Sequence, residues 1–253
     1  MTAAARPEPF LAALSVNELA LVEQSGFRPL GLVLGCSVYP VGDVEGRTDA
    51  GQLEVVTEAL YAARQRAMGR LETEADAAGA DGVIGLRFTL DTTEVDGLVH
   101  FTVLGTSLRA DRPPRTGTWR NARGLPFTAT LDGQDFWTLL RSGYAPVGVV
   151  VGASSYPGRG SLPERWVRTR STSAEAVPLT EAVYAARDRA VARLRAEAEE
   201  LAADGVVDLR FTGLPELDRT VAAQMLAIGT AVRTLGGTDR LPAPTPVLPM
   251  TDG

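Results

Sequence analysis

The chain has 253 residues, of which 45% are hydrophobic and 22% are charged, which is a globular composition. All 25 basic residues are arginine, and there is one histidine, His100, and one cysteine, Cys36. These counts exclude a Schiff-base lysine, a P-loop lysine, a disulfide within the chain, and a zinc site built from several Cys and His ligands of one chain. The net charge of −6 argues against binding of polyanions by the chain as a whole.

The elements predicted at the start of the chain alternate between helix and strand. Ser15-Val16-Asn17-Glu18 has the spacing of a capping box, so a short helix should begin there and end at Gly26. The apolar segment 30–35 predicts a buried strand whose glycines allow close backbone approach. A long helix is expected over 52–78, followed by two antiparallel strands over 83–90 and 98–109. The apolar stripe of the long helix is Val56, Leu60, Ala63, Ala67, Leu71 and Ala75.

The same pattern is then written a second time. Pro9-Phe10 returns as Pro126-Phe127, an offset of 117 positions. The offset becomes 123 where Tyr61-Ala62-Ala63-Arg64 returns as Tyr184-Ala185-Ala186-Arg187, so the second copy has a six-residue insertion. The second copy therefore predicts a strand over 147–152 and a long helix over 174–202.

The repeat defines the expected domains. They are copy one at 9–109, a basic Pro-rich linker at 110–125, copy two at 126–235, and a Pro-rich flexible tail at 236–253. One helix on one small antiparallel sheet leaves apolar sheet surface and strand edges uncovered, so we expect oligomerisation.

The string from Gly79 to Phe88, GADGVIGLRF, resembles the signature of the YbjQ-like family, as do the closing strings 105–108 and 229–232. The alanine-rich helix before it, with Arg64, Ala67, Met68 and Ala75, is similar to that family as well. The resemblance implies an α+β fold of two tandem dodecin-like β-α-β-β domains, each a long helix packed on a small antiparallel sheet. It also implies a ring-shaped oligomer, commonly a pentamer, and a heavy-metal-binding label without an established reaction. In copy two, Asp208 replaces Gly85 and Ala202 replaces Gly79, so we expect a lost backbone contact there.

The best polar set shared by both copies combines a carboxylate, a phenol and guanidinium groups. Its members are Glu58, Tyr61, Arg64 and Arg87, repeated as Glu181, Tyr184, Arg187 and Arg210. Tyr61 and Arg64 are three residues apart and should share one helix face. The set predicts either a pocket for an anionic ligand or a subunit interface held by salt bridges, and we favour the interface.

The duplication also tests a metal site. Cys36 aligns with Ala153, and His100 aligns with Gln224, so neither soft ligand is kept in both copies. We therefore predict no metal-binding residues and no cofactor. Convergence of several copies of Cys36 or His100 on the axis of a symmetric ring stays open as an alternative.

The sequence predicts no enzyme, because it contains no nucleophile–base pair of the required kind. Ser37 and Ser154 do not lie in a G-x-S-x-G elbow, and Asp81 and Asp204 are explained by Asp-Gly turns.

Two basic loops contain tryptophan. They are Arg112, Arg115, Trp119, Arg120 and Arg123 in the linker, and Arg159, Arg165, Trp166, Arg168 and Arg170 in the insertion. We favour contact of these loops with the acidic loop of another unit, at Asp43, Glu45 and Asp49, over nucleic-acid binding, because no nucleic-acid-binding motif is present.

The sequence as a whole thus predicts a non-catalytic scaffold or binding protein. Its expected partner is itself, in a ring-like homo-oligomer, with a pentamer of tandem domains preferred. Metal or small-anion binding at subunit interfaces is the alternative, and an enzyme is the third. The tail could dock a protein partner. We expect a cytoplasmic protein with no nucleic-acid partner, no signal segment and no membrane span.

Overall fold

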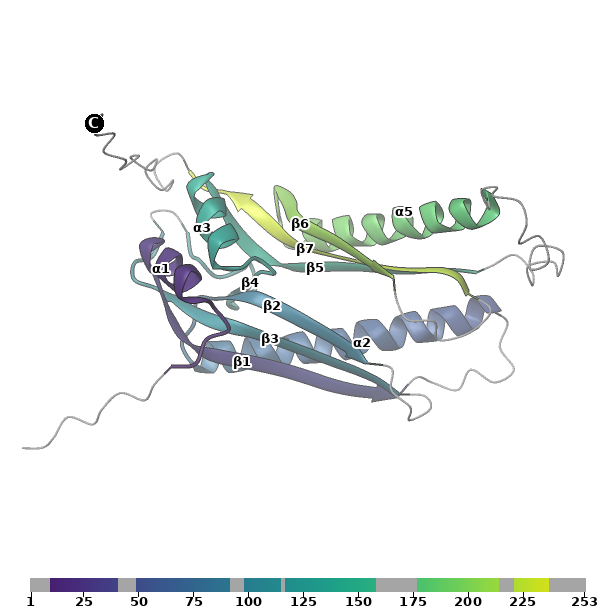
Figure 1. The fold of residues 1–253 in the computed structure, drawn as a ribbon, viewed down its shortest axis with the longest axis horizontal. Coiled ribbons are helices and arrows are strands. Elements are labelled where there is room, and N and C mark those ends of the chain that lie inside the picture. Colours follow the sequence, from purple (N-terminus) through teal and green to yellow (C-terminus); the bar gives the residue numbers. More distant parts are fainter. Residues whose placement is uncertain are drawn as a thin grey trace, which may run out of the picture.

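The computed structural model describes residues 10–40, 49–91, 98–114, 117–157, 177–213 and 221–236. Two similar α+β units follow one another along the chain (Figure 1). The first contains α1 (Val16–Gln24), β1 (Phe27–Pro40), α2 (Asp49–Ala77), β2 (Gly82–Asp91) and β3 (Leu98–Ala110). The second contains β4 (Phe127–Thr128), α3 (Gly133–Arg141), β5 (Tyr144–Pro157), α5 (Val177–Glu200), β6 (Gly205–Gly213) and β7 (Val221–Thr234). The predicted tandem duplication is confirmed.

Each unit has one small sheet with β1 or β5 at its edge. The first sheet has the order β1-β3-β2-β4 and the second has the order β5-β7-β6. The three long strands of each sheet pair antiparallel, as predicted. The edge strands extend beyond the predicted segments 30–35 and 147–152, because pairing with the central strand continues through polar and proline residues, from Phe27↔Ala110 to Pro40↔Leu98 in the first sheet.

The first short helix has the predicted ends, and the short helix of the second unit has matching ones. Ser15 caps α1 through a complete capping box with Glu18, and Asp132 caps α3 by accepting from the Asp135 backbone N–H. Gly26 and Gly143 follow these helices with φ values of +78° and +84°, the left-handed conformation in which glycine is unstrained.

The long helices pack unusually close to their sheets. A Cβ added to Gly35 would lie 1.9 Å from the carbonyl oxygen of Ala67, and one added to Gly152 would lie 1.8 Å from that of Ala190. Within the predicted stripe, the side chains from Leu60 to Ala75 are buried, whereas that of Val56 lies outside the described residues. Small residues on both surfaces therefore bring helix and strand together.

The expected loss of a backbone contact in copy two is wrong. Gly79 and Gly85 have φ values of +72° and +64°, and an added Cβ at either position would meet no atom closer than 3.8 Å. These sites require a left-handed backbone rather than space. Ala202 and Asp208 adopt that same conformation, with φ values of +52° and +51°, so the turn is preserved at the cost of local strain.

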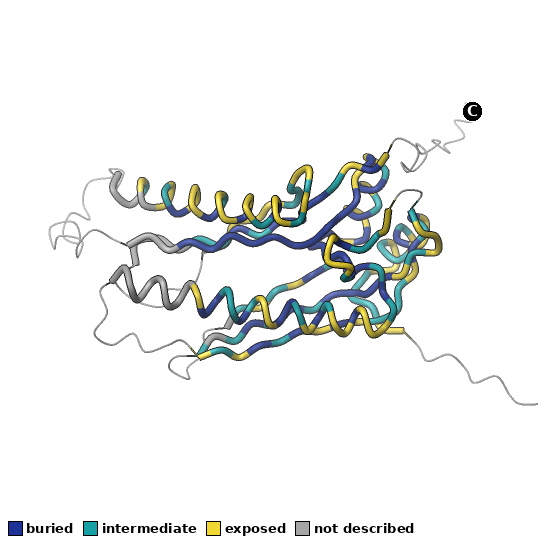
Figure 2. Tube along the Cα trace, turned by 180° about the vertical axis from the view of Figure 1, so that it is seen from behind, coloured by how far each residue is buried: buried dark blue, intermediate teal, exposed yellow. Residues whose placement is uncertain are grey.

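The two units stack so that helices and sheets alternate. α5 covers one face of the second sheet, and α2 lies between the other face of that sheet and the first sheet (Figure 1). One apolar cluster accordingly joins Ala63, Ala67 and Leu71 of α2 with Val149 and Val151 of β5. Viewed from behind, β5 is buried along most of its described length, while β1 has exposed positions (Figure 2).

The start of copy two completes the sheet of copy one. β4 pairs parallel with β2, and the Ala129 N–H donates to the Val83 carbonyl at 2.9 Å. Two residues further on, the Gly85 N–H donates to the Leu131 carbonyl at 2.7 Å. The edge of β2 is therefore paired by the other unit.

No helix among the described residues is long and apolar enough to cross a membrane. The basic loop of the insertion, the acidic residues Asp43 and Glu45, and the tail after Gly236 lie outside the described part of the chain.

Candidate functional site: the seam between the units

Tyr61 and Arg64, predicted to share a helix face, both reach from α2 to the second unit. The Ala153 backbone N–H, on the outer edge of β5, donates to the Tyr61 hydroxyl at 2.7 Å. The Arg64 guanidinium lies 5.8 Å from the centroid of the Tyr61 ring. The two side chains therefore lie together and point toward the β5 edge.

Arg64 binds Glu197 of α5 through two parallel hydrogen bonds. Nη1 donates to Oε1 at 2.9 Å and Nη2 donates to Oε2 at 3.1 Å. The same carboxylate accepts the Val151 backbone N–H at 2.9 Å. The Arg64 side chain is 17% exposed and that of Glu197 is 26% exposed. This bidentate, partly desolvated pair should contribute more than a surface ion pair does.

The carboxylate that receives Arg64 has a counterpart in copy one. Glu74 accepts the Leu34 backbone N–H at 2.9 Å, as Glu197 accepts that of Val151. Glu197 is thus the partner of Arg64 that the repeated polar set did not include. Its signal was available, because Glu74 and Glu197 are aligned at the offset of 123.

We call the contact of α2 with β5 and α5 the seam. A cavity of about 640 Å³ lies there. Its lining includes Tyr61, Arg64, Glu72, Arg123 and Glu197. Burial raises the pKa of the half-buried Glu72 above its usual value, although Arg123 and Arg64 act in the opposite direction. The cavity therefore holds both charge signs and does not have the uniformly positive lining of an anion site.

The remaining predicted site residues are not brought together with this pair. Glu58 and Glu181 are exposed on their helices, and Arg87 is exposed on β2. Arg210 donates to Asp208, two residues earlier on β6, at 2.9 Å. Arg187 donates to its neighbour Asp188 and lies 4.9 Å from the Tyr184 ring centroid. The repeated Tyr–Arg unit is therefore present in both copies but is engaged with the other unit in one of them.

Cys36 and His100 occupy the same face of the first sheet, since Cys36 pairs with Thr102 and Val38 pairs with His100. In the described part of the chain, no three His, Cys, Asp or Glu residues gather as a metal would require.

Asp81 and Asp204 hold backbone in both units. The Asp81 carboxylate accepts the Ala110 N–H at 2.9 Å, and the Asp204 carboxylate accepts the Thr234 N–H at 2.6 Å. The hydrogen bonds from Thr234 lower the pKa of Asp204. Each aspartate therefore joins the turn before one strand to the end of the next, a role that accounts for it without catalysis.

The described part of the basic linker packs on the first unit. The Trp119 ring lies edge-on to Phe27 at 5.0 Å, and the Arg120 guanidinium donates to the Asp76 carboxylate and to the Ala80 carbonyl near the end of α2. These contacts account for both side chains without a nucleic-acid or membrane surface.

Both units match one known protein family. The family described as "Putative heavy-metal-binding", the YbjQ-like family, matches residues 46–110 and 166–235, once in each unit. The chain belongs to this family.

Individual relatives of this YbjQ-like chain fall into two groups. An encapsulin nanocompartment protein of Mycobacterium tuberculosis is 37% identical over 243 residues, which cover 95% of this chain and 92% of the relative. A UPF0145 protein of Psychrobacter arcticus is 40% identical over 60 residues, 24% of this chain and 37% of its own length. A UPF0145 protein of Halorubrum lacusprofundi is 50% identical over 54 residues, 21% of this chain and 50% of its own length. The tandem arrangement is thus shared along nearly the whole chain with the mycobacterial protein.

Proposed function

We propose that the chain is a non-catalytic structural protein that associates with copies of itself into a closed, ring-like homo-oligomer. The observation that carries the proposal is the outer face of the first sheet. Leu32, Leu34 and Val38 are 37%, 48% and 55% exposed on one strand. An apolar face of this kind, in a chain that buries the corresponding face of its second sheet, is typical of a protein interface.

The mycobacterial relative supports a role in assembly, since its name associates it with an encapsulin nanocompartment. A scaffold or shell-associated function for this chain agrees with that name. We expect a pentamer of tandem chains, following the family resemblance.

Native mass spectrometry of the full chain at micromolar concentration tests the proposal. A mass of several chains is expected, and light scattering at the same concentration should agree. A monomer in both measurements would overturn the proposal.

The runner-up is binding of a small anion or metal at subunit interfaces. The observation that favours it is the open groove of about 600 Å³ on α2, which has Arg66 and Arg70 in its lining. Elemental analysis and native mass spectrometry of the purified oligomer distinguish the two, because a ligand-free, metal-free oligomer supports the structural role alone.

A further inference from the structure

The seam between the two units joins two different surfaces, one from each copy. Because the chain is a duplication, each copy also carries its own version of the surface that the other copy contributes to the seam. In the seam, copy one provides a helix and an open strand edge, and copy two provides a sheet face and an extended segment. The sequence repeat supplies the counterpart of each element: α5 and the β6 edge in copy two, and the outer face of the first sheet and segment 10–14 in copy one.

The sheet faces differ only in what covers them. Val149, Val151 and Ala153 of β5 are 9%, 3% and 3% exposed, with α2 packed on that side of the sheet. Their counterparts at the offset of 117 are Leu32, Leu34 and Cys36. Leu32 and Leu34 are more than a third exposed, and Cys36 is half-buried. The uncovered face is therefore the copy-one version of a face that is already known to accept a helix.

The helices show the same asymmetry. Leu60 is 7% exposed in the seam, whereas its counterpart Val183 is 40% exposed. The Arg64 side chain is 17% exposed, whereas that of Arg187 is 46% exposed. Tyr184, the counterpart of Tyr61, is 55% exposed. α5 thus exposes to solvent the counterparts of the residues through which α2 docks on the second unit.

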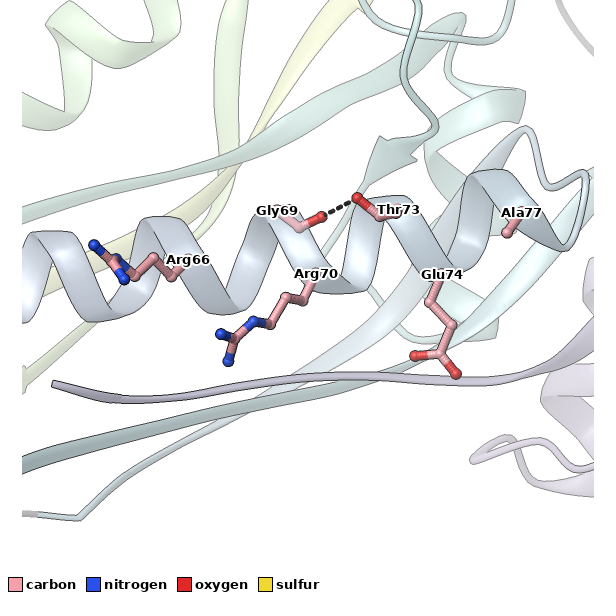
Figure 3. A pocket seen from close by; sticks show the side chains of 6 residues that line it. All are labelled: Arg66, Gly69, Arg70, Thr73, Glu74 and Ala77. Carbon is pink, nitrogen blue, oxygen red and sulfur yellow. Dashed lines mark hydrogen bonds between the residues drawn. The ribbon is translucent and has the colours of Figure 1, made fainter.

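The polar groups that receive the helix are also duplicated. Glu74 occupies the place of Glu197 and binds the edge strand in the same way, through Leu34. Arg70 donates to the Cys36 carbonyl as Arg193 donates to the Ala153 carbonyl. Figure 3 shows Arg70 and Glu74 pointing from α2 toward the strand below, in an open groove of about 600 Å³. In the seam, the corresponding position at Glu197 is filled by the Arg64 guanidinium.

The strand pairing in the seam also has a counterpart elsewhere in the chain, and it is independent of the helix contacts. In the seam, segment 127–131 lies along the edge of β2, with the Phe127 N–H donating to the Asp81 carbonyl and that of Ala129 donating to the Val83 carbonyl. The counterpart segment, 10–14, includes the exposed Phe10 and Leu11, at 49% and 66%. The counterpart of the β2 edge is β6, an edge strand of the second sheet.

We propose that each chain docks head to tail on a second copy through this repeated interface, with α5 of one chain covering the outer face of β1 in the next. The Tyr184 hydroxyl accepts the Cys36 N–H of the next chain, and Arg187 exchanges Asp188 for Glu74 of the next chain. Segment 10–14 of that same next chain lies along β6. The inference rests on the proposed self-association and names its contacts.

The two junctions are not identical at the short helices. Gly133 of α3 packs on Glu18 of α1 so closely that an added Cβ would lie 2.6 Å from the Glu18 Cβ. Its counterpart in copy one is Val16, which is 83% exposed. The junction between chains therefore holds its short helices further apart than the junction within a chain.

Charge reversal tests the interface in the full chain. Arg187→Glu and Glu74→Arg should each weaken association at least about tenfold and shift the oligomer toward monomer in native mass spectrometry. Both substitutions together in one chain should restore assembly, because every junction then joins opposite charges whatever the number of chains in the ring. Glu181→Arg is the matched control on α5, since its counterpart Glu58 stays exposed beside the complete seam, and it should leave the mass unchanged.

A backbone variant tests the strand pairing separately. Ala12→Pro removes the N–H that corresponds to the Ala129 donor, and it should also weaken assembly. Circular dichroism of each dissociated variant should match that of the wild-type chain, which separates loss of assembly from loss of folding. A wild-type chain that is monomeric overturns the proposed function itself. An oligomeric wild type whose mass is unchanged by R187E, E74R and A12P overturns only this interface.

Discussion

Glu197 holds the seam because its one carboxylate accepts hydrogen bonds from both units. It accepts the Val151 N–H from its own unit and both Arg64 nitrogens from the other. Removing only one side of such a pair leaves a partly buried charge without compensation, which costs more than the pair itself gains.

We therefore expect Arg64→Gln to lower the free energy of unfolding by about 1–3 kcal/mol. Combining it with Glu197→Gln should restore part of the loss, with a coupling energy of about 1 kcal/mol from the double-mutant cycle in urea. Additive effects of the two substitutions would show that the pair contributes nothing.

Glu72 gives the seam a pH dependence. Its pKa is raised in the folded state, so the folded chain holds this proton to higher pH than the unfolded chain does. Stability from this group is complete below the ordinary glutamate pKa and is lost as the pH rises through the raised value. Glu72→Gln should therefore stabilise the chain at pH 7 and have little effect at pH 4, as measured by denaturant unfolding at both pH values. An equal effect at both would contradict the assignment.

At the scale of elements, the contact between each long helix and its edge strand depends on the absence of a side chain. Gly35→Ala and Gly152→Ala should each cost about 3 kcal/mol, because the new methyl group meets a helix carbonyl that cannot move aside. Gly31→Ala is the control in the same strand, since an added Cβ there meets nothing within 4 Å. Its effect should stay within about 0.5 kcal/mol. Chemical denaturation of the three variants makes the comparison.

The elements were predictable wherever the pattern was local. Caps at Ser15 and Asp132, glycine ends at Gly26 and Gly143, and the alanine stripe of α2 all follow from nearest neighbours in the chain. β4 was not predicted, because two residues that pair with a strand of the other unit carry no periodic signal. The left-handed role of Gly79 was misread for a similar reason, since sequence does not distinguish a special φ from a close contact.

The candidate site was half predictable. The repeat identified Tyr61 and Arg64 as a pair on one face, and the structure places both at the seam. Their partners, the Ala153 N–H and Glu197, are separated from them by 92 and 133 residues of the chain. Which unit of a duplicated chain faces which other unit depends on the packing of whole sheets, and one sequence does not encode that in any short pattern.

At the scale of the whole molecule, the chain has one covered and one uncovered copy of the same sheet face. If association covers the second, only folded chains can associate, and mass action must stabilise them. We expect the midpoint of thermal unfolding to rise with chain concentration in the wild type and to rise less in R187E. Calorimetry over a hundredfold range of concentration measures both. A midpoint independent of concentration in the wild type would contradict self-association of the folded state.

The linker that joins the units also determines how many domains a closed ring can contain. Within a chain, the first junction forms between tethered surfaces at a high effective concentration, so only every second junction depends on an encounter between molecules. A closed head-to-tail ring of whole chains must contain an even number of domains, alternating between tethered and untethered junctions. Duplication has thus removed every ring with an odd number of domains from those that this sequence can build, and it halves the number of interfaces at which the ring can open.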